Sequence, residues 1–433
     1  WYRALLIFLY TCSLGLLRVD YAYTALPSPI FDGYLGTKQI IVAEVVSSID
    51  ARDTTLSFVV KPLTEDGSLE TVKHTPRIQV STDRLTDVSY GDIVRIEGTL
   101  KSIVSHSKTY ERIGEARIRK GILYEVKFAE VVFIERGQGN FFKYYSTVIH
   151  DWIQNTIITY VREPSAGFIN GILIGEKHAL SKEWYDAFTA VGLTHVIVLS
   201  GYNLTVIFAW TRILLRRTSF LIQNSLGALS VIILVLVSGA EAPAVRAGIL
   251  VLIVALAAVL QRQQDSGYFL SLAILCMLFV NPFYFLYDVS FQLSVAATYG
   301  LVYIGPIIQT QLKRVPRMLG EVVRDTSSAQ LAVLPLQLFY FGTLSWVALF
   351  VNVLVLPFIP LLMILGVLIL ATSVMPVIAL FVGTCAGLIS SILLSSVKVV
   401  STMVTPMAVS ISLWGLVLFY IILVFWIIQY KKT

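Results

Sequence analysis

Residues 346–371 read WVALFVNVLVLPFIPLLMILGVLILA, a run of 26 residues without a charged side chain. A helix needs about 20 apolar residues to cross the roughly 30 Å hydrocarbon core of a bilayer. A helix is also one of the few structures that can cross it, because its backbone hydrogen bonds are internal. This run therefore predicts a membrane-spanning helix.

The apolar character extends over much of the chain. Its 433 residues are 56% hydrophobic and 14% charged, which is more apolar surface than one soluble core can hide. Eight further segments are candidate spans: 196–215, 220–238, 248–260 with a start near Ala242, 268–285, 289–308, 328–344, 377–399 and 411–428. We expect a polytopic α-helical membrane protein rather than a soluble enzyme, with residues 192–433 as a multi-helix transmembrane channel domain.

Hydropathy falls between residues 38 and 136, where runs rich in Val, Ile and Phe alternate with turn residues. The expected strands are 39–48, 54–60, 77–80, 92–103 and 123–134. Five strands in about 100 residues suit a small Greek-key barrel. The run GDIVRIEG at residues 91–98 resembles a strand of an oligonucleotide/oligosaccharide-binding (OB) barrel. We therefore expect a small soluble OB-like β-barrel inserted into the membrane protein.

OB barrels bind single strands through basic grooves and stacking aromatic side chains. This segment offers both kinds of residue as DNA-binding candidates: Tyr90, Tyr110, Tyr124, Arg112, Arg117, Arg119 and Lys120. Its acidic residues match its basic ones in number, so a solvated spacer is an equal alternative.

The segments on either side of the barrel are expected to contact the membrane. Residues 1–37 contain a short apolar stretch at 4–17, which we interpret as a truncated membrane anchor with a linker. A signal peptide is less favoured, because no small-residue cleavage site is clear. Residues 137–191 carry two amphipathic patterns, at 141–161 and 181–190, which predict interfacial helices.

Basic residues give the expected topology, because Lys and Arg accumulate in short cytoplasmic loops. Alternation of the spans groups these residues on one side: Arg212, Arg216, Arg217, Arg262, the 313–324 loop, Lys431 and Lys432. The barrel then lies on the extracytoplasmic side.

Residues 167–207, GFINGILIGEKHALSKEWYDAFTAVGLTHVIVLSGYNLTVI, resemble the opening of the membrane domain of the ComEC competence family. The family's GLxHxxxxSG signature corresponds to Gly192, Leu193, His195, Ser200 and Gly201, after a Leu-Gly-Glu-like element at Ile174, Gly175 and Glu176. Later matches are Pro243 with Arg246-Ala247, Asn281-Pro282 with Asp288 and FQLS at 291–294, and then Gln330, Pro335, Phe341-Gly342, Ser345, Asn352 and Pro357.

The resemblance implies a channel that carries one strand of DNA across the bacterial cytoplasmic membrane during natural transformation. It implies as partners single-stranded DNA, the lipid bilayer, a cytoplasmic translocase ATPase and an extracytoplasmic DNA receptor. No P-loop motif is present in the chain, so the motive force would come from that partner. No cofactor is expected.

Two features depart from the family pattern. The usual SGLH reads Ser200-Gly201-Tyr202-Asn203 here, so any role of that His is lost or passes to Asn203. Many members also carry a C-terminal metallo-β-lactamase-like nuclease domain, whereas this chain lacks an HxHxDH string. Its five His residues are scattered, and no metal site is expected: His74, His106, His150, His178 and His195. Either a separate nuclease or a nuclease domain outside this sequence would then degrade the discarded strand.

Polar side chains inside apolar helices are costly unless they face protein or water, so they predict a lined path. The candidates are His195, Ser200, Asn203, Glu241, Arg246, Asp288, Gln292, Gln330, Gln337 and Asn352. Arg246 has two readings: a phosphate contact, or an ion pair with Glu241 or Asp288. Hinges or helix breaks are expected at Gly175, Gly192, Gly201, Pro243, Pro335 and Pro357, although ordinary helix packing also uses such residues.

Two other functions compete with DNA uptake. One is transport of a different anion or of an envelope precursor. The other is intramembrane hydrolysis by Ser200 and His195, which is disfavoured because no nearby acid would orient the histidine. We therefore expect no catalytic residue.

Overall fold

Alternating burial along the barrel strands builds a closed sheet. The computed structural model describes Tyr10, Ser13 and residues 31–47, 49–51, 55–63, 76–83, 86, 88–103, 121–136, 140–176, 180–197, 199–240, 242–260, 266–281, 284–285, 288–312, 314–404 and 407–432. Five strands form the ring: β1 (Lys38–Val45), β3 (Thr55–Pro62), β4 (Arg77–Asp83), β6 (Ile122–Val126) and β5 (Ile93–Ser102), which pairs back with β1. β4 and β6 are parallel and the other pairs antiparallel. The predicted OB-like barrel is confirmed, with its core inside this ring.

The last predicted strand of the barrel is wrong in detail. Residues 123–134 do not form one strand but two, β6 and β7 (Glu130–Glu135). The chain bends between them, where Phe128 takes a positive φ of 54°. A two-residue strand, β2 (Asp50–Ala51), was also not predicted and pairs with β3. Bends and two-residue strands of this kind show no alternation of apolar and polar residues, so hydropathy patterns do not predict them.

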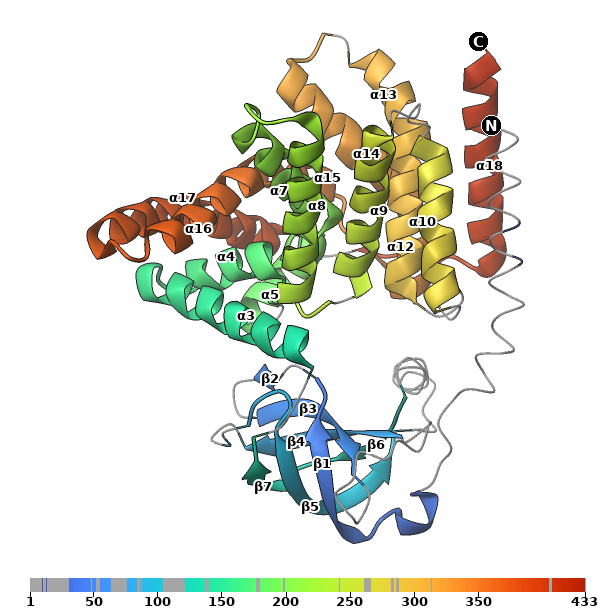
Figure 1. Cartoon of the computed structure of the whole chain (residues 1–433). Coiled ribbons are helices and arrows are strands. Elements are labelled where there is room, and N and C mark those ends of the chain that lie inside the picture. Colours follow the sequence, from blue (N-terminus) through green and yellow to red (C-terminus); the bar gives the residue numbers. More distant parts are fainter. Residues whose placement is uncertain are drawn as a thin grey trace. The chain divides into compact units, whose positions relative to one another are not determined.

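The chain forms two compact units, and the boundary falls inside helix α3 (Phe141–Tyr160), between Ile149 and His150. The barrel belongs to one unit, and almost all the remaining helices belong to the other (Figure 1). The described helices of this helical unit are α4 (Ser165–Ile174), α5 (Lys182–Ala190), α6 (Thr194–Ile197), α7 (Gly201–Leu214), α8 (Phe220–Val237), α9 (Ala242–Val259), α10 (Ser266–Val280), α12 (Val289–Tyr299), α13 (Gly305–Gln311), α14 (Arg317–Phe341), α15 (Ala348–Val355), α16 (Ile359–Thr372), α17 (Pro376–Met403) and α18 (Leu413–Lys432).

Two short helical turns and a small sheet connect these helices. A π-helical turn, Gly300–Ile304, joins α12 to α13, and a 3-10 turn, Leu356–Phe358, joins α15 to α16. Strands β8 (Thr343–Leu344) and β9 (Met407–Ala408) pair with each other.

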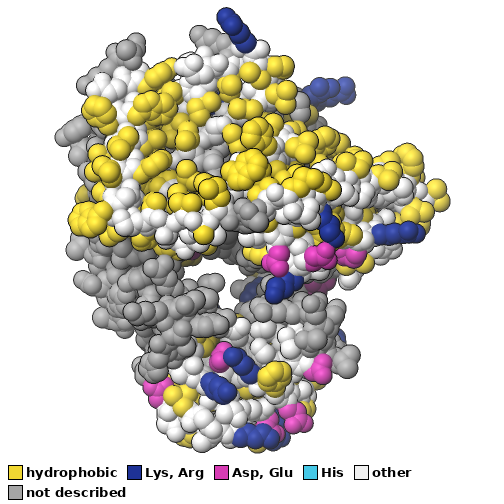
Figure 2. All heavy atoms as spheres, turned by 180° about the vertical axis from the view of Figure 1, so that it is seen from behind, with side chains coloured by type: hydrophobic (Ala, Val, Ile, Leu, Met, Phe, Trp, Pro, Cys, Tyr) yellow, Lys and Arg dark blue, Asp and Glu magenta, His cyan; other side chains and the backbone are white. Residues whose placement is uncertain are grey.

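Five helical stretches in the described part of the chain are long and apolar enough to cross a membrane. They are Phe220–Val237, Val289–Gln311, Ala348–Thr372, Pro376–Met403 and Leu413–Tyr430. The predicted span 196–215 is instead broken into α6 and α7, and α9 and α10 are shorter apolar helices. On the face seen in Figure 2, hydrophobic side chains gather over the helical unit, as lipid contact requires. The protein is a polytopic helical membrane protein.

The helices of this unit run in two directions. In Figure 1, α8, α9, α10, α12 and α18 stand roughly parallel, whereas α16 and α17 run across them beside α4. The basic end of α7, the α13–α14 connection and the basic end of α18 lie together at the upper end of the unit in this view. Loop charges predicted this grouping, and the side of the membrane that it faces stays a prediction.

Candidate functional site

A buried arginine lies near the first turn of α9. Arg246 is 5% exposed, and its Nη2 donates to the carbonyl oxygen and to the Oγ of Ser290, at 3.0 and 2.7 Å. Its Nη1 lies 3.7 Å from Oδ2 of Asp288. Neither Nε nor Nη1 has a hydrogen-bond partner among the described residues. The guanidinium is therefore held by Ser290 and by the ion pair, while its buried Nε and Nη1 donate no hydrogen bond among the described residues.

Asp288 has a second task as the N-cap of α12. Its Oδ1 accepts a hydrogen bond from the backbone N–H of Phe291, at 2.9 Å. An N-terminal carboxylate stabilises a helix by satisfying a free N–H and by its position at the positive end of the helix dipole. One carboxylate thus starts α12 and fixes the arginine of α9. Glu241, the other partner considered for Arg246, lies outside the described residues.

A column of polar contacts continues from this cluster along the paired helices α12 and α14. One turn after Asp288, Gln292 donates to the carbonyl oxygen of Phe285 at 2.9 Å and accepts from the hydroxyl of Tyr340 at 2.6 Å. Further along α14, the amide of Gln330 donates to that of Gln337 at 3.5 Å. All four of these side chains are half-buried: Gln292, Gln330, Gln337 and Tyr340.

The column reaches the other end of the helix pair. There, Arg324 of α14 donates to Oε1 of Gln309 in α13, at 3.2 Å. Asp288 and Gln309 are 21 residues apart in one nearly continuous helix, which is about 30 Å at 1.5 Å per residue. This length matches the hydrocarbon thickness of a bilayer. Polar groups at intervals over such a distance are costly in lipid and are typical of a path or of a helix contact.

The two family-like segments at 174–176 and 192–201 lie against each other. A Cβ at Gly171 would lie 2.8 Å from the carbonyl oxygen of Ile197, and one at Gly175 would lie 3.0 Å from Leu199. Gly175 also takes a φ of +78° as it ends α4. Glycine is thus required in α4, because the broken stretch between α6 and α7 approaches its backbone closely.

Asn203 holds this junction together. Its Nδ2 donates to the carbonyl oxygen of Ile172, at 2.9 Å, while its Oδ1 accepts from the hydroxyl of Ser200, at 3.1 Å. The Ser200 hydroxyl in turn caps α7 by accepting from the backbone N–H of Asn203. The serine is engaged in starting a helix, and His195 is an exposed side chain on α6.

Replacing Asn203 with alanine is expected to cost about 1–3 kcal/mol, because buried partners lose their hydrogen bonds. Histidine, the family residue, retains an N–H donor and should cost less. The measurement is the unfolding midpoint in detergent micelles. Thr205→Ala in the same helix is the control, with an expected change within about 0.5 kcal/mol. Equal effects of Asn203→Ala and Thr205→Ala would contradict this role.

The other helix-break candidates have differing environments. Gly192 takes a φ of +79°, and a Cβ there would lie 2.8 Å from that of Ala348. Gly201, the first residue of α7, is less crowded, with Ala247 at 3.3 Å. Pro335 lies inside α14, and Pro357 lies in the 3-10 turn before α16.

Two further candidates complete the helical set. Pro243 is the second residue of α9, so the predicted kink is wrong there: a first-turn proline costs no helical hydrogen bond. Asn352 is buried in α15, and its Oδ1 accepts no hydrogen bond from the part of the chain that the structure describes.

In the barrel, the stacking prediction is wrong for Tyr124. Its ring is 1% exposed in the core, and its hydroxyl donates to Oδ1 of Asp32 at 2.8 Å. Burial and this hydrogen bond raise the pKa of Tyr124 to about 12. Tyr90 is half-buried beneath the ammonium of Lys143, 4.2 Å from the ring centroid. The other five candidates, Tyr110, Arg112, Arg117, Arg119 and Lys120, lie outside the described residues.

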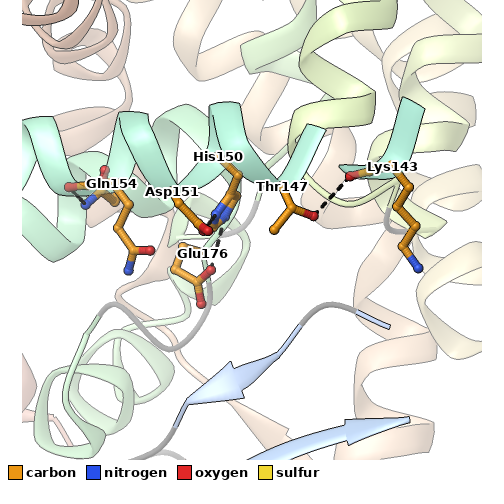
Figure 3. A network of polar contacts seen from close by, with 7 residues as sticks. Lys143, Thr147, His150, Asp151, Gln154 and Glu176 are labelled. Atoms are coloured by element: carbon orange, nitrogen blue, oxygen red, sulfur yellow. Dashed lines mark hydrogen bonds and ion pairs between the residues drawn. The ribbon is translucent and has the colours of Figure 1, made fainter. Parts of the chain in front are cut away.

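Sequence reasoning missed an ion pair between the end of α4 and α3. Nε2 of His150 lies 3.3 Å from Glu176, and Nδ1 lies 3.3 Å from Asp151 (Figure 3). Burial opposes protonation of the imidazole, but hydrogen bonds to Asp151 and Glu176 and their charges outweigh it and raise the pKa of His150 to about 9. Glu176 belongs to the family-like element at 174–176. Its pairing with His150 could not be predicted from the sequence, because the two residues come together only in the folded chain.

This ion pair should be lost at alkaline pH. Since the pKa of His150 is raised above its unfolded value of about 6.5, the stabilisation is complete below that pH and disappears as pH rises through about 9. Hydrogen exchange of α3 should therefore accelerate between pH 8 and 10, after correction for the intrinsic rate (bounds set about the pKa). Glu176→Gln should move this step to lower pH, and Glu176→Gln combined with Asp151→Asn should abolish it. A double variant that keeps the step would contradict the assignment.

The apolar helices and the column of polar contacts together define a multi-pass membrane protein with a row of polar side chains along one helix pair of its helical unit. The family model described as "Competence protein" matches residues 172–433, more than half of the chain. The chain therefore belongs to the competence protein family.

One curated relative supports this membership. ComE operon protein 3 of Bacillus subtilis (strain 168) is 24% identical over 196 residues, which cover 45% of this chain and 25% of that protein. The aligned region thus spans about a quarter of the relative's length. No solved structure matches the chain.

Proposed function

We propose that the chain conducts one strand of DNA across the bacterial cytoplasmic membrane during natural transformation. The observation that carries this proposal is the polar column from Arg246 and Asp288 to Arg324 and Gln309, which has the length of a bilayer within an otherwise apolar unit. Membership in the competence protein family and the name of the Bacillus relative support the same reading.

Arg246 has the chemistry of a phosphate contact on this path. Its guanidinium is buried, and two of its nitrogens have no hydrogen-bond partner among the described residues. Phosphate oxygens accept such donors well, and one or a few fixed cations suffice to favour a polyanion while still allowing it to move. Between the charged ends of the column, at Arg246 with Asp288 and at Arg324, the polar side chains are neutral amides and a phenol, which would hydrate a strand without trapping it: Gln292, Gln330, Gln337 and Tyr340.

The partners follow from this function. A translocase ATPase on the cytoplasmic side would pull the strand, a receptor outside would deliver DNA, and a nuclease would remove the other strand. The OB-like barrel would assist capture on the outer side.

A transformation assay tests the proposal. A deletion strain should bind DNA and bring it to the outer side of the cytoplasmic membrane but never deliver it to the cytoplasm. Arg246→Met should lower delivery more than Arg246→Lys, because lysine keeps the cation. Normal transformation of the deletion strain would refute the proposal. Loss of uptake of a small anion, with transformation intact, would favour the transporter alternative.

The hydrolase alternative has less support. The Ser200 hydroxyl donates to Asn203 rather than to a base. Alanine at Ser200 and His195 would abolish activity if these residues were catalytic. Under the channel proposal, the same variant should still transport DNA, at a level set by the amount of folded protein in the membrane.

A further inference from the structure

Helix α3 is arranged with its polar side toward protein and its apolar side outward. Lys143, Thr147, His150 and Gln154 follow one another at steps of three or four residues, which places them on one helix face. Figure 3 shows these side chains together on one side of α3. All four side chains are half-buried.

The partners of this polar face belong to the protein. Lys143 donates to the carbonyl oxygen of Val46, and its ammonium lies over the ring of Tyr90. His150 pairs with Glu176, and the hydroxyl of Thr147 donates to the backbone carbonyl oxygen of Lys143. Asn170 of α4 also donates to the backbone carbonyl oxygen of Gln154 at 3.5 Å. The side chains of Lys143, Thr147 and His150 therefore have partners within the chain.

The opposite face is apolar and uncovered over the first three turns. Its exposed residues include Phe142, at 71%, and Trp152, at 49%. The full set is Phe141, Phe142, Tyr144, Tyr145, Val148, Ile149 and Trp152. A patch of this size is rare on a surface that faces water, and the mixture of Tyr and Trp with Phe is typical of the headgroup level of a membrane.

We propose that this outward face of α3 inserts into the boundary between the headgroups and acyl chains of a phospholipid bilayer. The C-terminal end of α3 packs directly against a candidate membrane span: a Cβ at Gly383 of α17 would lie 2.5 Å from the backbone carbonyl oxygen of Tyr160 in α3.

Charge favours lipid over nucleic acid as the occupant. Apart from His150, Lys143 is the basic residue of α3, and its ammonium is turned inward. Binding to a phosphate backbone depends on exposed cations, whereas insertion of an amphipathic helix depends on buried apolar area. The exposed face of α3 has the second property and lacks the first.

Fluorescence quenching in lipid nanodiscs tests this proposal on the full chain. Single cysteines at Val148 and Trp152 would carry an environment-sensitive dye, after Cys12, Cys276 and Cys385 are replaced with serine. Val132 of the barrel, 53% exposed, is the water control, and Ile422 of α18, 59% exposed, is the acyl-chain control.

Lipids with a doxyl group near the headgroup should quench the dyes at Val148 and Trp152 at least about twofold more than the dye at Val132. The dye at Ile422 should respond more to a doxyl group deep in the acyl chain. Quenching of Val148 and Trp152 by aqueous iodide alone would overturn the proposal. Protection of both dyes from iodide and from the doxyl lipids would also overturn it, because it indicates that a protein, such as a second copy, covers this face. If the dyes are protected from iodide only after an oligonucleotide is added, the face binds DNA, and the proposal is again overturned.

Discussion

Replacing Asp288 with asparagine is expected to lower the free energy of unfolding of the helical unit by about 3 kcal/mol. Arg246 is 5% exposed and pairs with this carboxylate, so loss of the negative charge leaves a buried cation without compensation. Asparagine is as good an N-cap as aspartate, and the start of α12 is therefore retained. The variant thus isolates the ion pair from the cap.

Two further variants complete this experiment. Asp288→Ala removes the charge and also the hydrogen bond from the N–H of Phe291, and should cost about 1 kcal/mol more. Arg246→Met combined with Asp288→Asn removes both charges and should recover part of the loss. Unfolding by SDS in mixed micelles measures all three. If the double variant is no more stable than Asp288→Asn, the pair does not account for the loss.

The second large effect is expected at Gly300. A Cβ there would lie 2.3 Å from the carbonyl oxygen of Ser328 and 2.8 Å from Cβ of Ala332, so α14 packs directly on the backbone of the π-helical turn. Gly300→Ala must separate the two helices or distort the turn, at a cost of about 2–3 kcal/mol. Because the polar column lies between the same helices, transformation should fall as well.

Gly305→Ala is the matched control. It lies five residues further along the same continuous helix, and the nearest atom to its added Cβ would be Oγ of Ser328 at 3.7 Å. This is an ordinary contact distance, and alanine also favours helix, so we expect a change within about 0.5 kcal/mol. Similar unfolding midpoints for the two alanine variants would show that the close approach at Gly300 does not determine the stability of this helix pair.

Much of the fold can be predicted from the sequence, because bilayer thickness and strand alternation impose periods on it. The run at 346–371 became α15 and α16, and the alternation at 91–98 became β5. The bend at Phe128 and the helix break before Gly201 interrupt these periodic patterns, and tertiary contacts determine where they occur. Their positions depend on neighbours distant in sequence, such as Ser81, whose carbonyl accepts from Ala129, and Gly171.

The candidate site could be predicted only as a list of polar residues in apolar helices. Hydropathy singles out Arg246, Asp288 and Gln292, since each is costly in lipid. It gives no signal for Ser290 or Tyr340, which are common residue types at helix ends and become partners only through packing. The core position of Tyr124 was missed for a similar reason, because alternation within a strand leaves open which face is inside until the barrel closes.

Photocrosslinking of DNA in transit tests the central claim most directly. Benzoylphenylalanine would replace Gln330 or Gln337 in the column, and Ile422, which is exposed on α18, would be the control. In cells that take up labelled DNA, illumination should join the strand to positions 330 and 337 and leave 422 unlabelled. Absence of crosslinks at 330 and 337, in variants that still support transformation, would show that the strand does not pass along this column.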